Sequence, residues 1–420
     1  MTAALTSSTA KAWHARPGLL ARFIADLIAD ELSHLRPGGL ILPARPWPLD
    51  LALDEEGLGL DSLERLAVAS ALNEALHLHE SGIEDLLLAR QRFGEWVGVA
   101  ADGLTHFDTR LTFRTSGSSG SAKPCTHALA SLQQEVEYLG TLTAGTQRVL
   151  AAVPAHHIYG FLFTVLLPAR LGCEEVLDVR RQTPQTLAQM MRPGDLLISH
   201  PAHWALVARH AGRLPSGVNG VTSTAPCSDA LANSLEAIGL ASLTQVYGSS
   251  ETAGIGTRTS AAAPYRLMPF WSRDDGDTER LFRKDPHGSV CPHTIQDRLQ
   301  WPTAYDFSVC GRLDEAVQVG GTNVFPSHIR QALLQHPKVA DAVVRLMAPE
   351  EGSRLKAFIV PVPGADLDAL RAEIWSWTEA RLSAPARPKA YTLGERLPRN
   401  AMGKLADWPL STLSPQISNS

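Results

Sequence analysis

The segment FRTSGSSGSAKP, from Phe113 to Pro124, concentrates hydroxyl groups and glycines next to a lysine. Small residues leave backbone N–H groups uncovered, and such groups bind anions such as phosphate. The segment lacks the G-x-x-x-x-G-K-[ST] spacing of a Walker A loop, because Ala122 precedes Lys123 and Pro124 follows it. We interpret it as an anion-binding loop of another kind, although serine-glycine runs are more often ordinary connections.

Short β-prone runs come before this loop and before several others. Beyond residue 105, the runs LTFRTS, RVLAAVP, DLLISHP, GVTSTAP and LTQVYG alternate with helical segments, which predicts an α/β sheet. Four distinctive loops follow such runs: TSGSSGSAK, PAHHIYG, TSTAPCS and YGSSE. Ligands of α/β sheets bind beyond the carboxyl ends of the strands, so we expect the four loops to converge on one cleft.

The two ends of the chain have other patterns. From Leu19 to about Val99, apolar residues recur at helical spacing, and a proline-rich stretch LPARPWPLDLAL interrupts them. From about Gly311 the pattern predicts helix, strand, strand, helix and strand, which is enough for a small α+β domain. The chain is therefore expected to hold more than one domain.

Composition excludes several classes of partner. The 420 residues have a formal net charge of -5, and the basic residues are scattered, which argues against a nucleic-acid partner. The longest apolar runs are too short to span a bilayer, and the N-terminus lacks a signal-peptide core, so we expect no membrane partner and a cytoplasmic location.

Cysteine and histidine patterns give little support for a disulfide or metal site. The five cysteines are an odd number at wide spacings, which is typical of reduced structural residues. His200, His203 and His210 lie in one segment, but neither a carboxylate nor a cysteine joins them at ligand spacing. Packing or surface roles are favoured for these three histidines.

Five motifs in order resemble those of the adenylate-forming (AMP-binding) acyl and aryl acid ligases, which include acyl-CoA synthetases and phenylacetate-CoA ligases. Residues 115–123 resemble the family's phosphate loop, 154–160 its acyl-pocket motif and 247–251 its adenine and magnesium motif. Residues 311–326 are similar to the hinge region, with GTNVFPSHI closest to the phenylacetate-CoA ligase branch, and 398–404 resemble the C-terminal lysine motif. Ordered motifs are far more specific than any one alone.

The resemblance implies a set of site residues. Those implied for nucleotide binding are Thr115, Ser116, Gly117, Ser118, Ser119, Gly120, Lys123, Tyr247, Gly248, Ser249, Ser250, Asp297 and Arg312. Those implied for the acyl pocket are His157, Tyr159, Gly160 and Thr224. Glu251 would hold Mg²⁺ through oxygen, Lys404 would place its ammonium between the attacking carboxylate and the α-phosphate, and Asp314 would be the hinge.

The implied fold is α/β: a large ATP-binding domain, a small mobile α+β C-terminal domain and a helical N-terminal region. The predicted boundaries are a flexible lead at 1–18, a helical region at 19–100, the adenylation core at 101–313, the mobile domain at 314–412 and a polar tail at 413–420.

The helical region has a resemblance of its own. GLGLDSLERLAVASALNEALHLHESG is similar to an acyl carrier protein around its phosphopantetheine serine, with Ser62 in that position. The alternative is that Asp61 or Ser62 only caps a helix. The short connections around this helix favour a degenerate carrier in which Ser62 stays unmodified.

The implied reaction uses ATP and Mg²⁺ to make an acyl-AMP, and then transfers the acyl group to a thiol. An amino-acid substrate would need a buried carboxylate to pair its ammonium, and HHIYGFLFTVLLPARLG has none, so an aryl or apolar acid is favoured. The acceptor is an acyl carrier protein, CoA or phosphopantetheine on Ser62. The alternative function is a non-catalytic nucleotide-binding or carrier-docking protein that kept the fold.

Overall fold

The computed structural model describes residues 12–36, 41–115, 123–260, 262–274, 276–277, 279–312, 316–348, 351–398, 405 and 407–410, apart from the side chains of residues 311 and 312. The chain divides into two compact units. The larger one comprises residues up to 115 and 124–310, and the smaller one comprises 116–123 and everything from 311 onward.

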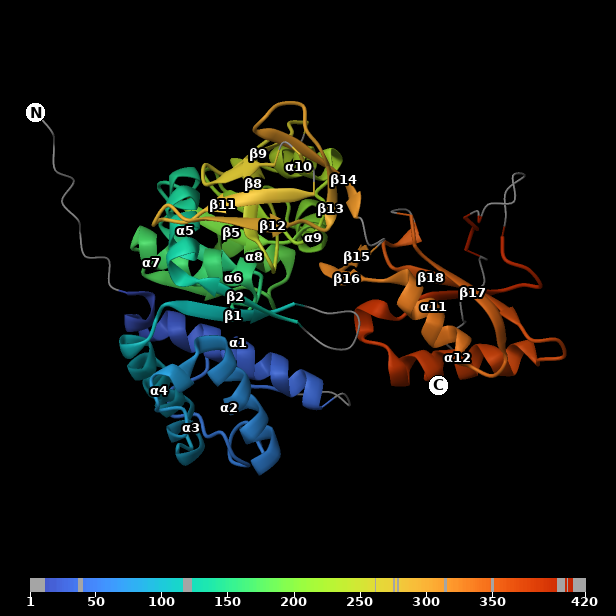
Figure 1. Cartoon of the computed structure of the whole chain (residues 1–420), viewed down its shortest axis with the longest axis horizontal. Coiled ribbons are helices and arrows are strands. Elements are labelled where there is room, and N and C mark those ends of the chain that lie inside the picture. The colour runs from blue at the N-terminus through green and yellow to red at the C-terminus, as the bar shows by residue number, and fades with distance from the viewer. Residues whose placement is uncertain are drawn as a thin grey trace, which may run out of the picture. The chain divides into compact units, whose positions relative to one another are not determined.

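A nine-stranded sheet forms the centre of the larger unit (Figure 1). Its strands in spatial order are β13 (Asp297–Gln300), β14 (Asp306–Arg312), β9 (Tyr265–Leu267), β8 (Ala253–Arg258), β7 (Ser242–Ser249), β6 (Asn219–Thr222), β5 (Asp195–Ser199), β3 (Arg148–Ala151) and β4 (Glu175–Asp178). Strands β4, β3, β5, β6 and β7 are parallel, whereas β8 is antiparallel to β7. The predicted α/β sheet is confirmed.

Helices cover both faces of this sheet because its central strands are apolar on both sides. In β5, Leu196 and Ile198 join one hydrophobic cluster and Leu197 joins the other. Such two-sided burial is typical of parallel strands. The first face packs against α5 (Leu129–Leu142), α6 (Ile158–Phe161), the π-helical turn η3 (Leu162–Leu166) and α7 (Leu167–Leu171), and the second against α8 (Pro184–Met190), α9 (Pro201–His210) and α10 (Asp229–Ala237).

Strand β1 (Arg110–Arg114) is not part of the nine-stranded sheet. It pairs in antiparallel fashion with β2 (Pro124–Ala128), with Phe113 opposite Cys125. The expectation that LTFRTS belongs to the main sheet was wrong, because β1 finds its hydrogen-bonding partner in the strand just after the loop. A further three-stranded sheet consists of β10 (Trp271–Arg273), β11 (Arg280–Lys284) and β12 (Val290–Thr294).

The N-terminal helices pack into the same hydrophobic core as the first face of the sheet. They are η1 (Trp13–Ala15), α1 (Pro17–Leu35), α2 (Ser62–Leu76), η2 (Leu78–Glu80), α3 (Leu86–Ala89) and α4 (Phe93–His106). The rings of Trp13, Phe23 and Phe113 surround Phe161 of α6, with centroid distances of 5.1, 5.5 and 5.3 Å. The helices of the predicted region 19–100 therefore share one hydrophobic core with the sheet of the larger unit.

The smaller unit has the predicted order of helix, strand, strand, helix and strand. A hairpin of β15 (Val317–Val319) and β16 (Thr322–Val324) precedes α11 (Pro326–Leu334), β17 (Val339–Leu346), β18 (Leu355–Pro361), α12 (Leu367–Arg381), η5 (Ala384–Ala386) and β19 (Ala390–Leu393). Strand β18 is antiparallel to β17 and parallel to β19. Across both units, no described helix combines the length and apolarity that a membrane crossing requires.

Candidate functional site

Three of the four predicted loops begin at the carboxyl ends of parallel strands and therefore lie on the same side of the sheet. Strands β3, β6 and β7 run parallel in the same sheet, so the loops that follow them all start at the carboxyl ends of the strands. These are the loops with residues 154–160, 223–228 and 249–252. The phosphate-loop candidate instead joins β1 to β2, with Thr115 directly after β1 and Lys123 directly before β2.

Tyr247 of the adenine and magnesium motif contacts Asp297, which is also predicted to bind the nucleotide. The Tyr247 hydroxyl donates a hydrogen bond to Asp297 Oδ2 over 2.7 Å, which joins residues 50 positions apart in sequence. The Tyr247 ring packs against Tyr265 and Phe307, with centroids 5.8 and 5.3 Å away. Gly248 follows, where a Cβ would lie 2.1 Å from a backbone carbonyl oxygen, so a larger residue does not fit. Two predicted nucleotide-binding residues are thus brought together.

His127 of β2 forms a hydrogen bond with the loop that contains Glu251. Its Nε2–H donates to the Ser250 carbonyl oxygen over 2.7 Å. Burial lowers the pKa of His127 to about 4, so the ring is neutral at pH 7. The bond therefore joins β2, the strand that follows the phosphate-loop candidate, to the adenine and magnesium motif. Glu251 itself is exposed, and a solvent-facing carboxylate is the oxygen ligand that Mg²⁺ accepts.

A buried ion pair lies behind the same loop. Glu135 of α5 accepts the Gly254 N–H at 2.9 Å, and its other oxygen is 3.5 Å from the Arg283 guanidinium. Arg283 also donates to the Thr252 carbonyl oxygen over 3.1 Å. Burial raises the pKa of Glu135 to about 7, against the opposing effect of Arg283. The pair therefore binds two backbone groups just after Glu251, the Thr252 carbonyl and the Gly254 N–H.

Helix α1 positions the acyl-pocket motif. Asp26, fully buried at its side chain, accepts the Ala155 N–H over 2.6 Å and an Arg180 N–H over 2.7 Å. Arg22, one turn earlier, donates to the Val153 carbonyl oxygen over 3.2 Å. Two charged residues of the N-terminal helix thus hold the backbone on which the motif begins.

The four residues predicted to line the acyl pocket have different surroundings. Burial lowers the pKa of His157 to about 3, so its ring is neutral. Tyr159 is buried and its hydroxyl donates to the Ser199 carbonyl oxygen over 2.8 Å, so it supports the core and does not have a free hydroxyl for a substrate. Gly160 packs against its own loop, where a Cβ would lie 1.8 Å from a carbonyl oxygen. Thr224 is exposed and has φ 74°, an uncommon conformation for a residue with a side chain.

Several predicted site residues lie outside the described residues: Ser116, Gly117, Ser118, Ser119, Gly120, Asp314, Lys404 and the side chain of Arg312.

Comparisons with known proteins decide the family. The AMP-binding enzyme family matches residues 72–278, and the AMP-binding enzyme C-terminal domain matches residues 328–404. A 4-coumarate–CoA ligase of Halorhodospira halophila is 41% identical over 386 residues, which cover 91% of this chain and 97% of that protein. The chain belongs to the AMP-binding enzymes. It is an adenylate-forming acid–thiol ligase.

Other relatives agree with this assignment. A 4-coumarate–CoA ligase of Rhodobacter capsulatus is 39% identical over 404 residues, covering 93% of this ligase and 100% of that protein. Among solved structures, an amide bond synthetase from Marinactinospora thermotolerans has a TM-score of 0.60 at 16% identity, covering 93% of each chain. An o-succinylbenzoate CoA synthetase from Bacillus subtilis has a TM-score of 0.57 at 21% identity, covering 70% of this chain and 67% of that one. These two structures confirm the adenylate-forming ligase fold.

Leu405, the residue after Lys404, is hydrogen-bonded within the smaller unit of the ligase. Lys404 itself lies outside the described residues, but the carbonyl oxygen of Leu405 accepts a hydrogen bond from Arg345 of β17 over 2.9 Å. The chain directly after the predicted catalytic lysine is therefore attached to the central sheet of that unit.

A buried lysine, which the sequence analysis did not identify, also binds the chain beyond Lys404. Lys356 of β18 has a fully buried side chain, and its ammonium is 2.8 Å from Glu351 and 3.1 Å from Asp407. The same ammonium donates to the Trp408 carbonyl oxygen over 2.8 Å. An ammonium buried this deeply is stable only with such partners, and they fix the chain four residues beyond Lys404.

Ser62 is exposed at the start of α2. The capping acceptor is its neighbour: Asp61 accepts the Glu64 N–H over 2.8 Å, and the Glu64 side chain accepts the Asp61 N–H over 3.1 Å. The Ser62 hydroxyl is therefore not the cap. The family match begins at residue 72, inside the segment that resembles a carrier protein, and the carrier resemblance stays a prediction.

The histidines of α9 form local hydrogen bonds. His200 Nδ1 accepts the His203 N–H over 3.4 Å at the start of the helix, and His203 Nδ1 is 2.7 Å from Ser199 Oγ. Burial lowers the pKa of both rings. These contacts agree with the packing role expected for them.

Proposed function

We propose that the ligase activates a small aryl acid of the 4-coumarate kind and transfers it to CoA. The carboxylate would attack the α-phosphate of ATP to give an aryl-AMP and pyrophosphate, and the CoA thiol would then displace AMP to give the thioester. The observation that carries the proposal is the similarity to 4-coumarate–CoA ligases, which extends over 97% and 100% of the lengths of two of them.

The geometry described above supports the nucleotide half of this reaction. Tyr247 and Asp297, bonded to each other, would hold adenine and ribose, and the loop fixed by His127 would present Glu251. Mg²⁺, bound through Glu251, would neutralise phosphate charge. Lys404 would stabilise the negative charge that develops when the carboxylate attacks phosphorus, and electrostatic stabilisation of this kind accounts for most of the rate enhancement in such transfers.

The acyl-pocket motif supports an aryl acid. The segment 156–172 contains no carboxylate that could pair a substrate ammonium, and the buried His157 is neutral at pH 7 because burial lowers its pKa to about 3. An uncharged ring enters such surroundings without the desolvation penalty of an unpaired charge. A hydroxycinnamate has one charge, on the carboxylate that reacts.

CoA is the acceptor in this proposal, and Ser62 stays unmodified. The support is that the 4-coumarate relatives are named as CoA ligases. The exposed Ser62 hydroxyl, unused by the helix cap, keeps a carrier-type acceptor as the second candidate.

Pyrophosphate exchange into ATP tests the first half-reaction. The full chain is assayed with 4-coumarate, cinnamate, benzoate, hydroxybenzoate and a fatty acid. Exchange should be fastest with the hydroxycinnamate. Exchange with the fatty acid alone would refute the aryl assignment, and a complete lack of exchange would refute the activity.

Thioester formation tests the acceptor. The same chain is incubated with ATP, 4-coumarate and either CoA or a separate carrier protein, and intact mass is measured after treatment with a phosphopantetheinyl transferase. We expect 4-coumaroyl-CoA and an unchanged protein mass. A mass gain of one phosphopantetheine that is absent in Ser62→Ala would instead establish the carrier-type acceptor.

A further inference from the structure

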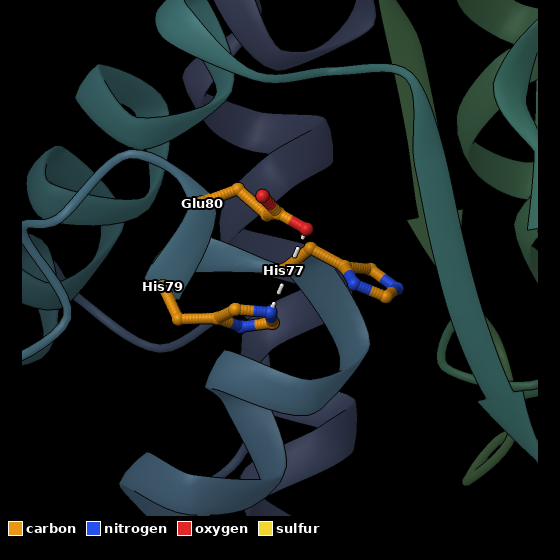
Figure 2. Close-up of side chains that lie close together, drawn as sticks. All are labelled: His77, His79 and Glu80. Carbon is orange, nitrogen blue, oxygen red and sulfur yellow. Dashed lines mark ion pairs between the residues drawn. The ribbon is translucent and has the colours of Figure 1, made fainter.

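The turn that ends α2 brings three metal-ligating side chains together. His77, His79 and Glu80 project from this turn, and a ring nitrogen of each histidine and a carboxylate oxygen lie within 4.8 Å of one another (Figure 2). His77 is the C-cap of α2 and has φ 54°, so the chain reverses at this residue. The cluster belongs to none of the motifs that the ligase reaction uses.

Hydrogen bonds determine which nitrogen of His79 carries a lone pair. His79 Nδ1 lies 3.2 Å from Asn73 Oδ1, and the same oxygen accepts the His79 backbone N–H over 2.8 Å. An amide oxygen only accepts, so Nδ1 must be the protonated nitrogen. In the neutral ring, Nε2 then has the lone pair, and it lies 3.9 Å from Glu80 Oε1. In that neutral tautomer, two hydrogen-bond acceptors face each other.

His77 has a matching arrangement. Its Nε2 is 2.9 Å from Thr112 Oγ1 on β1, whereas its Nδ1 is buried and has no hydrogen-bond partner among the described residues. In the tautomer whose Nε2–H donates to Thr112, the unpartnered Nδ1 has a free lone pair.

We propose that His77, His79 and Glu80 form a binding site for a divalent transition metal ion of the zinc class. Two imidazoles and a carboxylate are ligands that Zn²⁺ accepts, and a water molecule would complete a tetrahedron. Metal–ligand bonds of about 2.0–2.1 Å put tetrahedral ligand atoms about 3.4 Å apart, so the cluster must contract slightly. His79 and Glu80 are both exposed and free to rotate inward.

Some neighbouring side chains would stabilise the bound ion, and one would compete with it for Glu80. Thr112 and Asn73 would hold the two rings through their second nitrogens, as outer partners of metal-binding histidines do. Arg110 opposes the ion because its guanidinium already pairs with the Glu80 carboxylate. The site is therefore expected to bind more weakly than a closed structural zinc site, and removal of the Arg110 charge should strengthen it.

Zinc titration of the full chain tests the proposal. Protein freed of metal by chelation is titrated with Zn²⁺ in competition with a chromophoric indicator, and Co²⁺ absorption reports the coordination geometry. The variants are His79→Gln and Glu80→Gln at exposed positions, and His77→Asn, which tolerates a positive φ. The matched control is His106→Gln, an exposed histidine at the end of α4 whose hydrogen-bond partners among the described residues are Asp102 of its own helix and the adjacent Thr105.

One zinc ion per chain is expected for the wild type and for the His106→Gln control. Affinity should fall on the order of 10-fold to 100-fold in His79→Gln and Glu80→Gln, and it should rise in Arg110→Gln. No saturable zinc binding, or equal affinity in wild type, His79→Gln and Glu80→Gln, would overturn the proposal. Because these two variants lie at the surface, a folding defect in His77→Asn does not affect the conclusion.

Discussion

The buried pair of Glu135 and Arg283 should make the stability of the ligase depend on pH in a predictable way. The folded-state pKa of Glu135, about 7, is above its ordinary value of 4.5 because burial outweighs the attraction of Arg283. A carboxyl with a raised pKa stabilises the fold when protonated, so this contribution is complete below about pH 4.5 and is lost as pH rises through about 7. One pKa unit is worth about 1.4 kcal/mol, so the total is roughly 3 kcal/mol.

Glu135→Gln isolates this contribution. Glutamine keeps an oxygen for the Gly254 N–H but cannot ionise, so the variant should match the protonated wild type at low pH. As pH rises from about 5 to about 8, the free energy of unfolding of the wild type should fall by roughly 3 kcal/mol relative to the variant. Urea denaturation followed by tryptophan fluorescence measures the free energy of unfolding of the wild type and of the variant. Glu137→Gln, an exposed position on the same helix, is the matched control.

A difference between wild type and Glu135→Gln that stays constant across this pH range would refute the reasoning. It would mean that Glu135 is ionised throughout and that Arg283 offsets the cost of burial. In that case the variant should be less stable at every pH, by about 3–5 kcal/mol, because a buried guanidinium would be left unpaired.

Three further predictions concern catalysis. Lys404→Ala should slow adenylate formation by on the order of 10²-fold while thioester formation from supplied aryl-AMP survives, since the two steps have separate transition states; equal losses in both assays would contradict this. Glu251→Gln should lower ATP turnover, with partial recovery at high Mg²⁺, and an unchanged magnesium titration would show that Glu251 is not a ligand. Lys356→Met should reduce the rate of adenylate formation on the order of tenfold with little change in the KM for the acid, because the chain beyond Lys404 loses its anchor; steady-state kinetics with an unaltered rate would exclude that role.

The sequence predicted the sheet because its signals are local. Runs such as RVLAAVP and DLLISHP are apolar on consecutive positions, as strands buried on both faces must be, and the loops after them contain the recognisable motifs. The pairing of β1 was not predictable in the same way. LTFRT has the same strand propensity whether its partner is β2 or the main sheet, and only tertiary context decides between them.

The charged residues behind the site could not be found by spacing. Asp26 is one turn before the half-buried Asp30 on α1, and Glu135 is two residues before the exposed Glu137 on α5, so their own positions look equally ordinary in the sequence. Their partners, at Ala155 and Gly254, are 129 and 119 residues away. Lys356 stands within an apolar strand, and that was the one available signal, because a lysine at a buried strand position needs partners.

The bonds of α1 to the acyl-pocket motif have a consequence for synthesis on the ribosome. Asp26 is made 154 residues before Arg180, the partner of its carboxylate. At about 5–20 residues per second, the carboxylate waits roughly 8–30 s for this partner. Helices α2 and α4 reach α1 earlier, but the part of α1 that packs against η3 has no partner until residues 162–166 are made, so the new helix is a natural target for chaperones. Slow codons between α1 and β4 should therefore lower the soluble yield more than slow codons in the smaller unit.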